Sequence, residues 1–197
     1  MINHTANLQA GYQATYQTER DWFTSEIAKL KNLSTILPSL QVAVEKLQVK
    51  NTFLQMAFYA IYRQFVIDAH RIAVDEKNSK EKCLSSFFET VHHHLSEESR
   101  QELPPNYVIE TKASLKDALQ KTTKLRHNLF AHTNEKAVAS GNAQYLDMVE
   151  VRDCYEAIES CFHKITFENS VIFSSVNVIM DLAKIENLLL NYEKAHQ

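Results

Sequence analysis

Apolar residues recur every three to four positions along most of this chain, which is the spacing of one face of an α-helix. The first such run predicts a packed helix, and its members are Trp22, Phe23, Ile27, Leu30 and Leu33. We expect this helix to stop or restart at Pro38, because proline lacks the backbone N–H that a helix interior needs. Residues 1–17 are polar and predict an arm or a short helix.

The same spacing continues from Ser39 to Lys77. One straight helix of this length would span roughly 55 Å, which is long for a small domain, so we expect a break near Lys50-Asn51-Thr52. The part from Phe53 to Val74 is apolar almost all round. Such a helix is typically central and covered by several neighbours.

One polar line interrupts this central helix and lies on a single face of it; its members are Gln64, Asp68, Arg71 and Asp75. Charged side chains are rarely buried unpaired, so the line should face water, another charge or a site. Two interpretations stay open. Pairs within the helix, such as Asp68 with Arg71, would be a sufficient explanation. Alternatively, Asp68 or Arg71 lines a functional cleft and positions a catalytic residue.

The rest of the chain predicts four more helices. They begin at Ser79, at Thr111 or Ser114, at about Asp147 and at about Ser174. The strongest helix-breaking segment between them runs from Glu102 to Asn106 and contains two consecutive prolines. Asn134–Gln144 contains Gly141 and is expected to be a loop, followed by a helix that extends to about Phe167.

Composition agrees with this helical pattern. Two Gly and three Pro among 197 residues leave few places for tight turns, and no long stretch alternates with period two. A chain of this length can bury one substantial core. The sequence therefore predicts an all-α, single-domain bundle of about five to seven helices over residues 1–197.

Charge is distributed unevenly. The net charge of −3 excludes a basic coat of the histone kind, but steering of a ligand depends on where charges sit. Between Lys112 and Lys136, six Lys or Arg stand against Asp117 and Glu135, which is a local charge of +4. A solvated helix face is the ordinary alternative to a binding site here.

Cysteine and histidine residues give no metal site. Cys83, Cys154 and Cys161 are too few and too widely spaced for a disulfide framework or a CxxC site, and Cys154 and Cys161 suit one buried helix face. His92-His93-His94 cannot chelate one ion, because consecutive helical residues point about 100° apart. There is no signal-peptide pattern and no run of roughly 20 apolar residues. We expect no cofactor, no membrane span and a reducing cytoplasm.

The densest polar cluster is Leu125-Arg126-His127-Asn128-Leu129-Phe130-Ala131-His132. Its ordinary explanation is structural, because His132 continues the apolar stripe of Leu125 and Leu129. Asn128 and His132 are four apart and share a helix face. Arg126 and His132, however, lie roughly 120° apart around a regular helix, with a rise of about 9 Å. A common site for these two therefore needs a kink, or two copies that face each other across a two-fold axis.

The segment Arg126–His132 resembles the Arg-x4-6-His motif of the HEPN superfamily, whose members are small all-α domains. A polar residue commonly follows the arginine in that family, and His127 fits. Leu125–Asn134, together with Tyr62–Asp75, is most similar to the abortive-infection, toxin-like branch. Asn134 stands where some HEPN toxins carry a tyrosine that a partner nucleotidyltransferase modifies, so that kind of regulation is not expected.

The resemblance implies a metal-independent endoribonuclease of a toxin or phage-defence type that acts as a homodimer. Arg126 would bind the scissile phosphate and His132 would handle protons, roles that suit guanidinium and imidazole. His127, Asn128 and Asn134 would be supporting polar contacts. RNA would be the substrate, DNA would be inert, and an antitoxin protein is a conceivable partner. The rivals are a non-catalytic HEPN-like module that binds a nucleotide, RNA or protein, and a purely structural helical protein.

Overall fold

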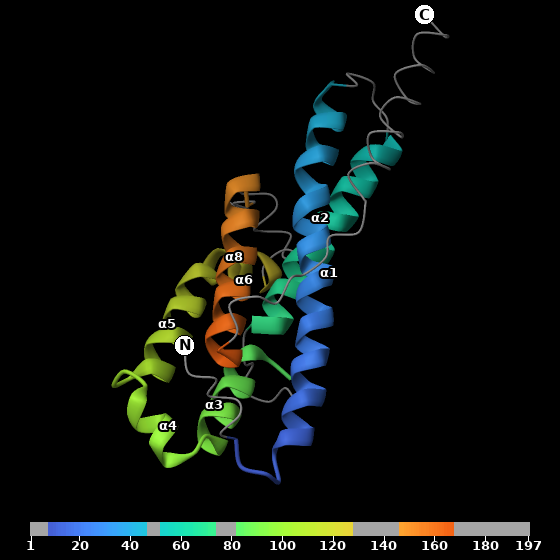
Figure 1. The fold of residues 1–197 in the computed structure, drawn as a ribbon. Helices are drawn as coiled ribbons and strands as arrows, with labels where there is room; N and C mark the ends of the chain where they lie inside the picture. The colour runs from blue at the N-terminus through green and yellow to red at the C-terminus, as the bar shows by residue number, and fades with distance from the viewer. Residues whose placement is uncertain (1–7, 47–51, 74–81, 128–145, 168–197) are drawn as a thin grey trace, which may run out of the picture.

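The computed structural model describes residues 8–46, 52–73, 82–127 and 146–167, and all of its regular elements there are helices (Figure 1). The prediction of an all-α fold is confirmed. The helices are α1 (Gln13–Lys46), α2 (Thr52–Ala73), α3 (Leu84–His94), α4 (Glu97–Glu102), α5 (Tyr107–Ala118), α6 (Gln120–Leu125) and α8 (Met148–Thr166). The expected helix from Ser174 and the expected loop Asn134–Gln144 lie outside the described residues.

The core forms where α2 and α8 meet the other helices. α2 runs back beside α1, and α8 packs against α1, α2, α3 and α5 (Figure 1). Most of the largest fully buried side chains come from α1, α2, α3 and α8; among them are Phe23, Phe65, Phe88, Phe162 and Ile158. α6 contacts α2 and α5, so the end of the α5–α6 segment lies against the central helix.

The prediction that a helix stops at Pro38 is wrong, because α1 continues through this residue. A proline inside a helix costs about 3 kcal/mol or more through its missing N–H and its ring. Leu37 is fully buried beside it, and Leu40 and Ala43 are buried in the next turns. Burial of these apolar side chains stabilises the helix by an amount of the same order as the cost of the proline, so α1 continues past Pro38.

The N-terminal residues from Leu8 onward pack against the bundle, although the polar composition of residues 1–17 predicts an arm or a short helix. Leu8 is buried and forms an isolated bridge with Leu95. Tyr12 and Tyr16 are also buried, and the Tyr12 ring stacks on that of His94 with 4.2 Å between centroids. This packing fixes the start of α1 against the end of α3.

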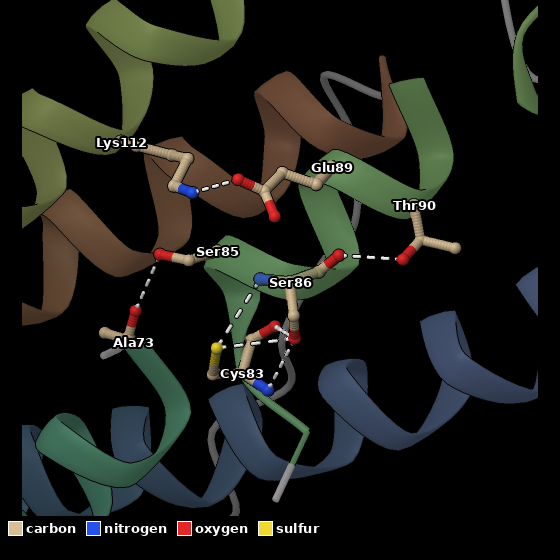
Figure 2. Close-up of polar contacts among 7 residues, drawn as sticks. All are labelled: Ala73, Cys83, Ser85, Ser86, Glu89, Thr90 and Lys112. Atoms are coloured by element: carbon tan, nitrogen blue, oxygen red, sulfur yellow. Dashed lines mark hydrogen bonds and ion pairs between the residues drawn. The ribbon is translucent and has the colours of Figure 1, made fainter. Parts of the chain in front are cut away.

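α3 begins at Leu84, later than the predicted start at Ser79, which lies outside the described residues. Cys83 caps the helix: its sulfur accepts the Ser86 backbone N–H at 3.5 Å, and the Ser86 hydroxyl accepts the Cys83 N–H at 3.3 Å (Figure 2). The Ser85 hydroxyl donates to the carbonyl of Ala73 at 3.3 Å. This bond ties the start of α3 to the last turn of α2.

The segment Glu102–Asn106 breaks the chain as expected: α4 ends at Glu102, and Asn106 takes a left-handed conformation (φ 66°) before α5. The helix that carries the motif begins at Tyr107, earlier than Thr111, and it is interrupted. Leu119 leaves the helical region (φ −100°, ψ 5°) and separates α5 from α6. Leu119 itself is fully buried, which anchors this bend in the core.

α8 agrees with its prediction at both ends. The Asp147 carboxylate accepts the backbone N–H of Glu150 at 2.8 Å, and the Glu150 carboxylate accepts the N–H of Asp147 at 2.9 Å. This reciprocal capping box satisfies two N–H groups that a helix start leaves without a helical partner. At the other end, Phe167 closes the helix in a left-handed conformation (φ 56°).

Candidate functional site

The first half of the motif lies at the C-terminal end of α6. Leu125 is buried and closes the regular helix, and Arg126 and His127 follow in a π-helical turn. The Arg126 N–H points to the carbonyls of both Thr122 and Thr123. Arg126 is half-buried and His127 is exposed. Single π-helical turns in α-helices are frequently found at functional sites.

His70 of α2 packs against this turn. Its side chain is only 2% exposed, and its ring meets the ring of His127 edge to face, with 5.5 Å between the centroids (84° between the planes). The Val66 and Ala69 side chains nearby on α2 are fully buried. A buried histidine of the central helix therefore contacts His127, the residue that follows Arg126.

The polar line on α2 joins a network that crosses to α1. Gln64 donates to the Asp68 carboxylate at 2.7 Å, and Arg71 lies 3.6 Å from Asp68. Arg71 also forms an ion pair with Glu26 of α1, and its guanidinium lies 5.7 Å from the ring centroid of Trp22. These contacts favour the structural interpretation for Gln64, Asp68 and Arg71, while Asp75 lies outside the described residues. A role of Asp68 or Arg71 in a cleft stays a prediction.

Glu26 is the buried member of this network, with 10% of its side chain exposed. Burial alone would raise the pKa of this carboxyl group, but hydrogen bonds from Lys29 and Arg71 outweigh burial and lower the pKa. The carboxylate is therefore charged in the folded protein at neutral pH. Its pairing with Arg71 fixes the register of α2 against α1.

The basic cluster is partly used for helix packing. Lys112 of α5 forms an ion pair with Glu89 of α3 (Figure 2), and Lys121 of α6 lies 2.6 Å from Glu150 of α8. Lys116 and Lys124 are exposed. Two of the predicted cationic groups therefore hold α5 and α6 in place, while Lys124 is exposed two residues before Arg126.

Asn128, His132 and Asn134 lie outside the described residues, as do Glu135 and Lys136 of the basic cluster. The structure brings His127, the neighbour of Arg126, against His70 of α2, and it does not describe where the motif histidine His132 stands. Whether the two ends of the motif meet stays a prediction.

The cysteines are buried, as expected for Cys154 and Cys161. Burial raises the pKa of each of these two thiols to about 12, and the Cys154 sulfur lies 3.4 Å from the Thr122 hydroxyl. In the described part of the chain, no three His, Cys, Asp or Glu side chains are grouped closely enough to hold a metal ion. None of the helices described here is both long and apolar enough to cross a bilayer.

Comparison of the chain with family models, curated proteins and solved structures gives no match. The resemblance to HEPN proteins therefore stays a prediction that rests on the residues of the motif and on the all-α fold.

Sequence reasoning missed two residues: His70, which contacts the candidate site, and Glu26, which pairs with Arg71 of the polar line. Both carried a signal. His70 stands between the apolar residues Val66 and Ala73 at helical spacing, and a polar side chain among them needs a polar or aromatic neighbour. Glu26 stands between Phe23, Ile27 and Leu30 on the first helix, where a buried acid calls for a cation such as Arg71.

Proposed function

We propose that this protein is a metal-independent endoribonuclease that works as a homodimer, with Arg126 and His132 as its catalytic residues. The single observation that carries the proposal is the position of Arg126. It follows the last regular turn of α6, half-buried, in a π-helical turn that rests on the buried ring of His70 through His127. A phosphate-binding guanidinium needs this kind of rigid support together with access to solvent.

The chemistry needs one cation and one group that exchanges protons near neutral pH. Arg126 would hold the scissile phosphate with two parallel N–H donors and balance the charge that grows on it. His132 would take the proton of the ribose 2′-hydroxyl, whose oxygen then attacks phosphorus. The bond between phosphorus and the 5′-oxygen breaks, and the 5′-oxygen takes up the proton that His132 had accepted. The products are a 2′,3′-cyclic phosphate and a new 5′-hydroxyl end.

The cations along α5 and α6 support a polyanionic substrate. Lys124 and Arg126 are two residues apart at the end of α6, and Lys116 is exposed on α5. The chain as a whole carries a charge of −3, so attraction of RNA would depend on this cluster. Binding should therefore weaken steeply as salt rises, because cationic contacts to phosphates release counterions.

A dimer would complete the site. On a regular helix, Arg126 and His132 would point about 120° apart, which favours a cleft in which the arginine of one copy works with the histidine of the other. Antitoxin binding and a role in phage defence belong to the same proposal. They follow from the resemblance of the motif to toxin-like HEPN proteins.

The direct test is incubation of the protein with total RNA and with tRNA in the presence of EDTA. We expect wild type to cut RNA, to leave a matching DNA strand intact, and to yield cyclic-phosphate ends. Arg126→Ala and His132→Ala should abolish cleavage while the dimer, followed by sedimentation, persists. Arg152→Ala, which removes an exposed arginine on α8 away from the basic cluster, is the matched control and should keep most of the activity.

Two outcomes would contradict the proposal. Retained RNA binding without cleavage by wild type would favour the non-catalytic binding module. A loss of thermal stability in both motif variants, with neither cleavage nor RNA binding in wild type, would favour a purely structural role for Arg126 and His132.

A further inference from the structure

One face of α2 stays accessible along the half of the helix that precedes the candidate site. Met56 is 66% exposed and Tyr59 is 47% exposed, which is unusual for large apolar side chains on a central helix. Tyr59 borders two hollows. The larger, of about 670 Å³, is also lined by Gln55, Met56, Ala60, Arg63, Gln64 and Ile67. The smaller, of about 350 Å³, is also lined by Gln41, Phe58, Tyr62, Leu146, Asp147 and Met148.

The two hollows differ in chemistry. The smaller one is aromatic: the rings of Phe58 and Tyr62 stack with 6.1 Å between centroids. The Tyr62 hydroxyl accepts the backbone N–H of Leu146 at 2.6 Å, so this ring is fixed in its place. The larger hollow offers a guanidinium, Arg63, and side-chain amides. None of its lining residues that the structure describes is acidic, although the chain has more Asp and Glu than Lys and Arg.

This face leads to the motif. Met56, Tyr59, Arg63, Ile67 and His70 are spaced three or four apart, so they follow one side of α2. His70 is the residue that contacts His127. By the rise of an α-helix, Arg63 lies about 10 Å and Tyr59 about 16 Å from this contact along the helix axis. An extended strand lying on this face would therefore reach Arg126.

Resting on the proposed function, we infer that this face of α2 is the binding track for single-stranded RNA beside the cleavage site. A base stacks on Tyr59 and enters the aromatic hollow, and Arg63 binds the adjoining phosphate. Exposed aromatic rings alternating with cations are how proteins hold single strands with little dependence on sequence. Double-stranded RNA cannot use the track, since its bases are already stacked and paired.

The test measures binding apart from cleavage. A labelled oligouridylate is titrated by fluorescence anisotropy against His132→Ala, which is expected not to cut it. In this background Tyr59→Leu should raise the dissociation constant about ten-fold or more, the effect of losing one stacked base. Tyr59→Phe should keep the affinity, because it keeps the ring. Arg63→Gln should weaken binding and reduce its salt dependence.

The control variants remove one exposed apolar side chain and one exposed arginine elsewhere on the protein. Ile109→Ala removes an exposed apolar side chain on α5 (68% exposed), and Arg152→Gln removes an exposed arginine on α8. Neither should change the dissociation constant. The inference is overturned if wild type and His132→Ala bind no single strand, or if the controls weaken binding as much as Tyr59→Leu does.

Two other occupants of the face give different results, and either one overturns the inference. If a second copy of the chain covers it, Tyr59→Leu dissociates the dimer. If the chain's own segments cover it, Tyr59→Leu lowers the melting temperature and leaves RNA affinity unchanged.

Failure of the track and failure of the proposed function are distinguishable. If wild type cuts RNA and Tyr59→Leu leaves KM unchanged, the track is wrong and the ribonuclease stands. If wild type never cuts RNA but binding depends on the Tyr59 ring, the track stands without the ribonuclease.

Discussion

The buried ring of His70 meets the ring of His127 edge to face, with 5.5 Å between their centroids. This contact joins the central helix α2 to the turn that presents Arg126. Aromatic pairs in this arrangement contribute roughly 0.5–1.5 kcal/mol beyond the area that they bury. The first residues of the motif, Arg126 and His127, therefore rest on a residue of the core.

Replacement of His70 by alanine should loosen this support. We expect His70→Ala to lower the free energy of unfolding by about 2 kcal/mol, because it empties a buried position. RNA cleavage by the remaining folded protein should also fall, because the turn that carries Arg126 loses the contact between His70 and His127. Denaturant titration and cleavage rates measured together separate the two effects. His93→Ala, an exposed histidine on α3, is the control and should change neither.

Arg71 should matter for stability more than its place on a helix surface suggests. In Arg71→Ala the carboxylate of Glu26 stays buried without its interhelical partner, which should cost about 3 kcal/mol. Arg152→Ala breaks exposed pairs with Asp153 and Glu156 and should cost about 0.5 kcal/mol or less. Equal unfolding midpoints for the two variants would show that the Glu26–Arg71 pair does not hold α1 to α2.

Acid should weaken the same contact. The folded-state pKa of Glu26 lies below its ordinary value of 4.5, so its stabilising effect is complete above that value and is lost as pH falls through the folded-state pKa. We expect urea midpoints to fall over this acidic range. Glu26→Gln should be less stable than wild type at neutral pH and should show a flatter acid profile. Parallel profiles for the two proteins would contradict this assignment.

The cysteine thiols should be unreactive until the protein unfolds. All three are buried, and the pKa values of Cys154 and Cys161 are raised to about 12. Thiolate is the reactive form, so very little of it exists near neutral pH. A colorimetric disulfide reagent should therefore titrate the thiols only in denaturant. Rapid reaction of Cys154 or Cys161 in the native protein would show that α8 is less well packed than described.

Much of the fold could be predicted because strong local signals agreed with packing. α8 begins at the Asp147 capping box and carries a clear apolar stripe, so both of its ends were found. Pro38 was misjudged because burial of Leu37 and Leu40 overrides the local cost of proline. That outcome depends on neighbouring helices far along the chain, which periodicity does not reveal.

The candidate site was predicted only in part. Arg126 and His127 were found from the motif. A kink between Arg126 and His132 and a site shared by two copies were the two alternatives for bringing these residues together, and both stay predictions. The support by His70 and the pairing of Arg71 with Glu26 were not found. Both depend on which face of α2 meets α6 and which meets α1. The spacing of residues in one sequence shows which side chains share a helix face, but it does not show which other helix that face contacts.

The central claim is that two copies of the motif form one ribonuclease site, and subunit mixing tests it most directly. Arg126→Ala and His132→Ala homodimers, each inactive, are unfolded together, refolded and assayed for RNA cleavage in EDTA. If arginine and histidine act across the dimer, each mixed dimer has one intact site, and activity should return to about a quarter of wild type. No recovery, with mixed dimers shown to form, would contradict the claim.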